Sequence, residues 1–214
     1  MAGPGRIKLL NPVILAGFSF LIFAPIELIA GFTLHNPTIS ANASHDAFDG
    51  LFFLIGGSID VLLARSTRHA LYCWSRKGLS IAIGLLASVF VGIGILLAQT
   101  PEAGASQLVA ALILGPASIA LNWWWHKRLE VHGDEHHHGY NVHLLVDAGS
   151  GLIVIGAAIL TTALDDATIN LWGAYSILSL AFFLGVRALW RDFPTLIHRP
   201  SNHPLTTGSH GQTH

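Results

Sequence analysis

Charged residues are scarce in this chain of 214 residues: Asp, Glu, Lys and Arg together make up 11% of it, whereas hydrophobic residues make up 52%. Soluble domains carry about a quarter charged residues, so the shortage argues against a soluble globular enzyme, and the apolar content excludes a disordered chain. The formal net charge of −1 leaves no basic field to recruit nucleic acid. The single cysteine, Cys73, excludes an internal disulfide and a cysteine-based metal site.

Long apolar runs predict six membrane-spanning helices. A helix needs about 20 mostly apolar residues to cross the hydrocarbon core of a bilayer. Such runs occupy residues 12–34, 41–64, 78–99, 104–125, 135–163 and 168–190. We therefore expect an all-α membrane protein with one six-helix transmembrane domain over residues 1–190. Residues 191–214 are expected to form a short, disordered tail that contains histidines and no soluble regulatory domain.

The basic residues predict the orientation of these helices. All 11 Lys and Arg lie before the first span, between the second and third, after the fourth, or at and beyond the end of the sixth. The other three connections contain none. Because basic loops stay cytoplasmic, we expect both termini in the cytoplasm. The six tryptophans lie near span ends, as in an aromatic belt. We expect an integral, multi-pass protein of the plasma (inner) membrane.

Two of the predicted spans contain a histidine followed four residues later by an aspartate. His45 and Asp49 lie in the second span, and His143 and Asp147 lie in the fifth. Residues four apart share a helix face, and ionisable residues inside a bilayer indicate function. Two imidazole nitrogens and two carboxylate oxygens suit tetrahedral Zn²⁺, and the carboxylates would cancel its charge. The alternative is that each pair is only an intrahelical hydrogen bond.

The depth of the two pairs is a difficulty for this interpretation. Counted along the helices, His45 falls near the outer end of the second span, whereas Asp147 falls about 25 Å from the outer end of the fifth. A tilted or protruding fifth helix would bring the pairs to the same level.

Three segments resemble the cation diffusion facilitators. They are ELIAG at residues 27–31, SHDAFDG at 44–50 and NVHLLVD at 141–147. The resemblance implies a dimer of six-helix bundles that exchanges zinc or another transition metal for protons. It also implies a metal site in the middle of the membrane, built from the second and fifth helices. The matching positions are His45, Asp49, His143 and Asp147.

The sequence departs from this family in three places. Asn42 stands where the family often has an acid before the second-helix histidine, and residues 72–77 lack the usual Gly- and Glu-containing stretch. Residues 191–214 are too few for the soluble cytoplasmic domain that the family typically carries. We therefore expect a homodimer to form through membrane helices, and Gly- and Ser-containing faces at 56–58 and 149–151 are candidates for close helix contact. Packing within one chain is the other use of these faces.

Further ionisable residues are candidates for supporting roles. Histidine, with 13 copies, outnumbers either charge class. His136, His137 and His138 precede the fifth-span pair, and Asp60 lies three turns beyond Asp49. These four are candidates for metal capture at the cytoplasmic side, and solvated positions without a transport role are the alternative. Glu27, the one acid in the first span, is a candidate for a proton path or for a hydrogen bond to a neighbouring helix.

The sequence therefore predicts a secondary active transporter and not an enzyme. We expect it to export Zn²⁺ from the cytoplasm in exchange for protons by alternating access, with Cd²⁺, Co²⁺, Fe²⁺ and Mn²⁺ as further candidate cargoes. The alternative is an intramembrane zinc-dependent hydrolase, which would use three protein ligands and a metal-bound water. A haem-binding electron carrier is a third interpretation, and the absence of histidine from spans three, four and six argues against it.

Overall fold

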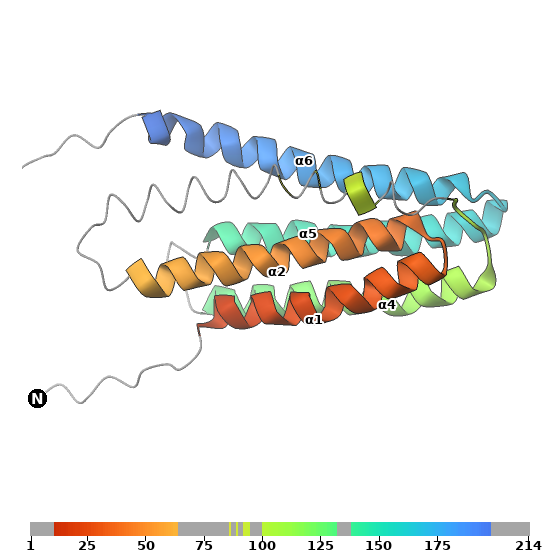
Figure 1. The fold of residues 1–214 in the computed structure, drawn as a ribbon, viewed down its shortest axis with the longest axis horizontal. Helices are drawn as coiled ribbons and strands as arrows, with labels where there is room; N and C mark the ends of the chain where they lie inside the picture. The colour runs from red at the N-terminus through yellow and green to blue at the C-terminus, as the bar shows by residue number, and fades with distance from the viewer. Residues whose placement is uncertain are drawn as a thin grey trace, which may run out of the picture.

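The computed structural model is helical wherever it assigns regular secondary structure. It describes residues 11–63, 86, 89, 92–94, 100–131 and 138–197. The long helices of this part are α1 (Pro12–Thr33), α2 (Pro37–Leu63), α4 (Ala105–Val131), α5 (His138–Leu164) and α6 (Thr168–Ile197) (Figure 1). These residues contain no strand. The expected all-α class is thus confirmed for the described residues.

Helices α1 and α2 both begin at an Asn-Pro sequence. The side chain of Asn11 accepts a hydrogen bond from the backbone N–H of Val13 at 2.9 Å, and that of Asn36 accepts one from Ile39 at 3.0 Å. Asparagine suits such a cap, and proline suits the first helical position because it has no N–H to satisfy. The second helix therefore starts at Pro37, four residues before the expected boundary at 41.

Two helices extend further than expected at the ends that the sequence predicts to be cytoplasmic. Helix α4 continues to Val131, and α6 continues to Ile197, within the stretch expected to be a tail. Hydropathy detects where a helix leaves the hydrocarbon, and charged residues can continue it beyond that point. The expected third span at 78–99 lies mostly outside the described residues; residues 86, 89 and 92–94 within it are helical.

Helices α2 and α5 are the central elements of the bundle. Helix α1 packs along α2, α4 packs along α5, and α6 contacts both α2 and α5 (Figure 1). The α1–α2 turn, the start of α4 and the α5–α6 connection lie together at one end, on the right of Figure 1. We call this end the hairpin end.

Two pairs of glycines allow the backbones of neighbouring helices to approach closely. A Cβ added at Gly17 would lie 2.7 Å from the carbonyl oxygen of Gly50, and one at Gly151 would lie 2.8 Å from that of Gly115. Helix α1 thus packs on α2, and α4 on α5, with their backbones nearly in contact. The small face expected around 149–151 is used at Gly151 for packing within the chain.

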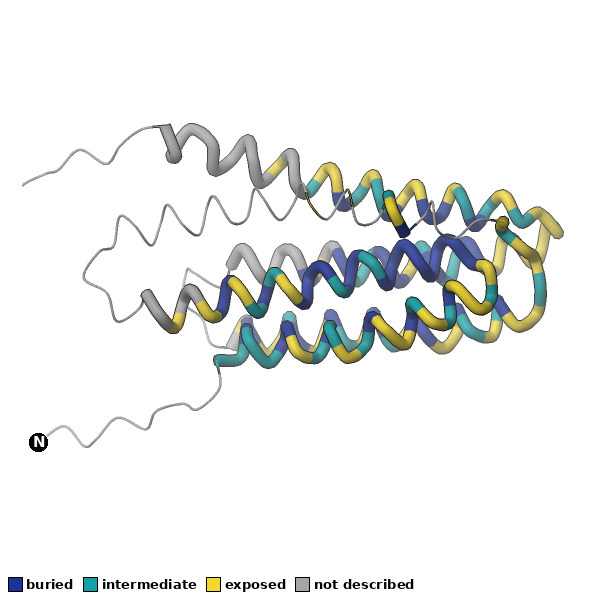
Figure 2. Tube along the Cα trace, in the orientation of Figure 1, coloured by how far each residue is buried: buried dark blue, intermediate teal, exposed yellow. Residues whose placement is uncertain are grey.

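The described part of the bundle exposes large apolar side chains and buries ionisable ones among its apolar core, unlike a soluble protein. Large apolar side chains are exposed, among them Ile22 at 69% and Leu152 at 64%. Figure 2 shows exposed positions recurring along the outer sides of the helices. The buried residues include one histidine and four acids: Glu27, His45, Asp46, Asp49 and Asp147. Three helical segments are long and apolar enough to cross a membrane, namely Pro12–Thr33, Ala105–Glu130 and Asp147–Leu164.

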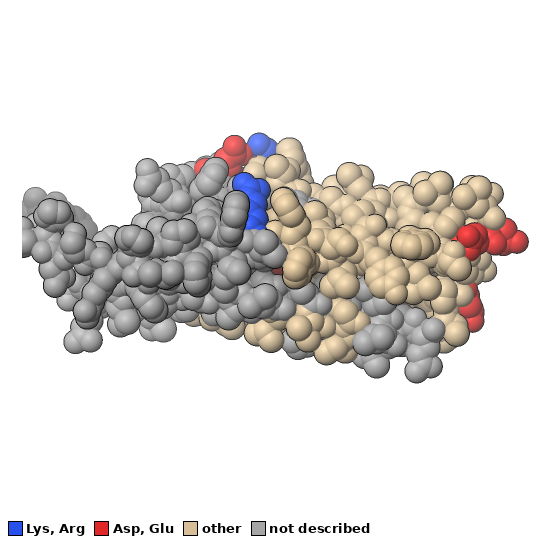
Figure 3. Space-filling view, turned by 90° about the horizontal axis from the view of Figure 1, so that it is seen from above, with Lys and Arg blue, Asp and Glu red and all other residues tan. Residues whose placement is uncertain are grey.

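Charges are distributed unevenly along the bundle. Acidic side chains gather at the hairpin end, and the described Lys and Arg lie away from it (Figure 3). The connections there contain Glu102, Asp165 and Asp166 and no basic residue. Asp166 accepts hydrogen bonds from the backbone N–H and the hydroxyl of Thr168, and these bonds hold the pKa of its carboxyl below the usual range.

The glycine contacts predict opposite effects for two substitutions on α5. Gly151→Ala should lower the thermal stability of the purified protein, since the new methyl group meets the backbone oxygen of Gly115; overpacking of this kind costs about 1–3 kcal/mol. Gly156→Ala is the matched control, because no described atom lies within 4 Å of its added Cβ. It should leave stability unchanged or raise it by up to about 1 kcal/mol. Equal melting temperatures, followed by circular dichroism in detergent, would contradict this packing.

Candidate metal centre

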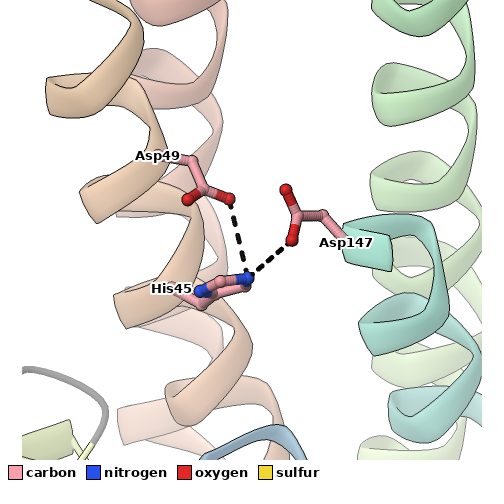
Figure 4. Close-up of side chains that lie close together, drawn as sticks. All are labelled: His45, Asp49 and Asp147. Atoms are coloured by element: carbon pink, nitrogen blue, oxygen red, sulfur yellow. Dashed lines mark hydrogen bonds and ion pairs between the residues drawn. The ribbon is translucent and has the colours of Figure 1, made fainter. Parts of the chain in front are cut away.

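The structure brings together three of the four residues of the duplicated motif. The Nε2 atom of His45 lies 2.9 Å from Oδ1 of Asp147 and 3.6 Å from Oδ2 of Asp49. Figure 4 shows His45 and Asp49 on α2 facing Asp147 on α5. One ligand atom from each of the three lies within 4.8 Å of the other two. The shortest contact joins two helices, so the pair on α2 is more than an intrahelical hydrogen bond.

This cluster is almost completely removed from solvent. His45 is 2% exposed, and Asp49 and Asp147 are both fully buried. Two ionised carboxylates and a neutral imidazole carry a combined charge of −2, and buried charge is tolerated only when it is paired. A divalent cation would neutralise the cluster, and one nitrogen with two carboxylate oxygens provides ligands that Zn²⁺ accepts.

The expected difference in depth is closed by the unequal lengths of the two hairpins. His45 lies about 12 Å from the start of α2, whereas Asp147 lies about 25 Å from the end of α5. The α5–α6 connection extends beyond the α1–α2 turn at the hairpin end (Figure 1). The protruding fifth helix therefore places Asp147 at the level of His45.

The remaining candidate ligands lie at the limit of the described structure. His143 and His138 belong to α5, and Asp60 belongs to α2, but their side chains are outside the described part. His136 and His137 lie outside the described residues altogether. The fourth ligand and the cytoplasmic capture positions remain sequence-based predictions.

A second group of buried polar residues surrounds Glu27. Its two carboxylate oxygens both lie 3.0 Å from the amide nitrogen of Asn42 on α2. The same nitrogen lies 3.5 Å from the hydroxyl of Ser118 on α4. Of the two roles expected for Glu27, the structure contains the hydrogen bond to a neighbouring helix.

Sequence reasoning missed the part that Asp46 plays in this second group. Asp46 is fully buried and lies one helical turn from Asn42, whose amide nitrogen contacts Glu27. The sequence carries a signal for it, because Asn42 and Asp46 are four residues apart, as are His45 and Asp49. Helix α2 thus holds two interleaved pairs on neighbouring faces.

Apolar clusters lie on both sides of the metal-ligand group along the bundle axis. Toward the hairpin end, a cluster is formed by Ile39, Ala41, Ala111, Leu114, Val154, Ala158, Ala174 and Ile177. A second cluster, formed by Val13, Ala16, Phe20, Phe53, Trp125, Leu129 and Leu144, lies toward the other end. Each contains residues from four of the described helices.

Hydrogen bonds between uncharged groups also join the helices at the hairpin end. The amide nitrogen of Gln107 on α4 donates to the backbone oxygen of Leu34 at 2.8 Å, and its amide oxygen accepts from Asn170 on α6 at 3.1 Å. The hydroxyl of Thr38 on α2 donates to the backbone oxygen of Asn170 at 2.6 Å. All of these partners except Leu34 are buried.

Comparison with known proteins does not identify a family. No family model matches the chain, and no curated protein matches it with significance. The resemblance to the cation diffusion facilitators rests on the three segments quoted from the sequence.

The geometry predicts which substitutions remove metal binding. Asp147→Asn and His45→Ala should each weaken Zn²⁺ binding by more than about 100-fold, because each breaks a buried, charge-balanced group. Glu102→Gln, which changes an exposed acid outside the cluster, should bind as tightly as the native chain. Titration calorimetry on detergent-purified protein measures all three. Unchanged zinc affinity in Asp147→Asn would exclude this group as the zinc site.

Proposed function

We propose that the protein exports Zn²⁺ across a membrane by alternating-access exchange with protons. The main support is the meeting of His45, Asp49 and Asp147 from two helices inside a bundle whose outer surface is apolar. A charged cluster at this position is expensive to bury, and such residues in membrane helices characteristically line ion pathways. The proposed activity is that of the cation diffusion facilitators, and Cd²⁺, Co²⁺, Fe²⁺ and Mn²⁺ remain candidate cargoes beside zinc.

The proposed topology has six spans in the plasma membrane, with the third at 78–99. In this topology both termini lie in the cytoplasm. Two features support it. The connections gathered at the hairpin end are acidic and lack Lys and Arg, as expected of external loops. The basic residues of α4 and α6 lie toward the opposite end. A homodimer through membrane helices is part of the same proposal.

The proposed cycle uses competition between metal and protons at the same atoms. Zinc needs a neutral imidazole and ionised carboxylates, so its binding releases protons and protonation releases zinc. Opening of the cluster around Phe20 and Phe53 would admit zinc from the cytoplasm. Zinc would be released outside when the cluster around Ile39 and Val154 opens and the hydrogen bonds of Gln107 break.

His143 distinguishes transport from the alternative of zinc-dependent hydrolysis. As a fourth ligand it completes a closed tetrahedral set, whereas a catalytic site keeps one position for water. We expect Co²⁺, used as an optical probe, to show tetrahedral absorption bands in the native protein that shift in His143→Ala. X-ray absorption of the zinc-loaded protein should count two nitrogen ligands. A zinc-bound water in place of the second nitrogen would favour the hydrolase.

Proton coupling is tested in vesicles that contain a zinc dye on one side and a pH dye on the other. Zinc movement should be accompanied by opposite proton movement, and an imposed pH gradient should drive it. An unperturbed histidine titrates near pH 6.5, so zinc affinity should fall as the pH drops from about 7.5 to 5.5. Asp49→Asn should abolish both signals, and Glu102→Gln should retain them. Zinc flux without a proton signal would indicate a uniporter.

A further inference from the structure

The residues around Glu27 form a group of acceptor oxygens with too few donors. Both carboxylate oxygens of Asp46 are buried without a hydrogen-bond donor, and so is the amide oxygen of Asn42. Glu27, which contacts Asn42 one turn away from Asp46 on α2, is itself an acid. Buried polar atoms without partners are rare in proteins and indicate a bound water or ion, or a functional role. Two buried carboxylates in one group cannot both stay ionised unless a proton or a metal cation balances them.

The ligand chemistry of this group differs from that of the His45 cluster. Its oxygen atoms are those of the Glu27 and Asp46 carboxylates and the Ser118 hydroxyl, and the Asn42 amide, which now points its nitrogen at Glu27 and Ser118, adds its oxygen once it turns over. They come from α1, α2 and α4, and none is a nitrogen acceptor or a sulfur. Oxygen-only sets of this kind suit hard cations such as Mg²⁺, Ca²⁺ and Mn²⁺, whereas zinc favours sites with imidazole or thiolate.

The charge of the buried interior also favours a divalent cation at this group. The described interior holds four carboxylates, those of Glu27, Asp46, Asp49 and Asp147. A divalent ion at the His45 cluster balances Asp49 and Asp147 and leaves a charge of −2 on the other two. A second divalent cation would make the whole interior neutral, which a low-dielectric environment strongly favours.

We propose that Glu27, Asn42, Asp46 and Ser118 form a second cation site, separate from the His45 cluster, for a hard divalent cation of the Mg²⁺ and Mn²⁺ class. The site does not depend on zinc transport. It is linked to the His45 cluster, however, because Asp46 follows His45 directly in α2 and both side chains are buried in the same interior. A cation at either site therefore weakens binding of a cation at the other, and the effect is reciprocal.

Manganese is the probe for this site, because its unpaired electrons report both its amount and its ligands. The full chain in detergent at pH 7.5, saturated with Zn²⁺, should bind about one Mn²⁺ per chain. Electron spin-echo modulation should show no directly bound nitrogen. Asp46→Asn and Glu27→Gln should each weaken Mn²⁺ binding by more than about 100-fold and still bind zinc, which also shows that they fold.

Substitutions at the other cluster provide the matched comparison. Asp147→Asn should lose zinc but keep the bound Mn²⁺, and Glu102→Gln should keep both ions. Absence of bound Mn²⁺ from the zinc-saturated native protein would overturn the proposal, because protons would then balance Glu27 and Asp46. Nitrogen coupling to the bound Mn²⁺ would overturn it as well, since the ion would lie at His45. Bound Mn²⁺ in a protein that moves no zinc would refute the transport function alone.

Discussion

The contact between His45 and Asp147 joins the two central helices at a depth where neither residue meets solvent. Both side chains lose water on burial, and an unpaired carboxylate there would cost several kcal/mol. The arrangement of α2 against α5 is therefore constrained by charge as well as by shape. Any rearrangement that separates the two helices must supply a new partner to Asp147, whether a proton, a metal ion or water. The packing of α2 against α5 and the charge state of Asp147 therefore depend on each other.

Helix α2 contributes more of the buried polar residues than any other described helix, because its polar residues are spaced four apart. Asn42 and Asp46 share one face, and His45 and Asp49 share another that is rotated by about 60°. The first pair faces Glu27 on α1 and Ser118 on α4, and the second faces Asp147 on α5. A single helix thus contributes to two clusters that interact through space but use different partner helices.

The sequence predicted the five long helices of the described residues, because apolar run length is a local signal. The repeated His-x-x-x-Asp pattern and the resemblance to the cation diffusion facilitators also predicted that α2 and α5 meet, which the contact between His45 and Asp147 confirms. The sequence misplaced the start of α2 because Asn36 and Thr38 are polar yet buried. Their partners, Gln107 and Asn170, are distant in the chain, so no local pattern reveals them. The sequence did not predict the contact between Glu27 and Asn42 for the same reason, because a lone acid in a span identifies no particular partner.

The glycine contacts divide the described bundle into two tightly packed pairs, α1 with α2 and α4 with α5. Where backbones touch, as at Gly17 with Gly50 and Gly115 with Gly151, sliding or separation would lose many close contacts at once. The His45 cluster lies between these pairs, across the α2–α5 interface, and both apolar clusters also bridge them. In the proposed transport cycle each pair would move as a unit. Rocking of one pair against the other would then open one apolar cluster while the other stayed closed, and metal or protons at His45 and Asp147 would determine which arrangement is stable.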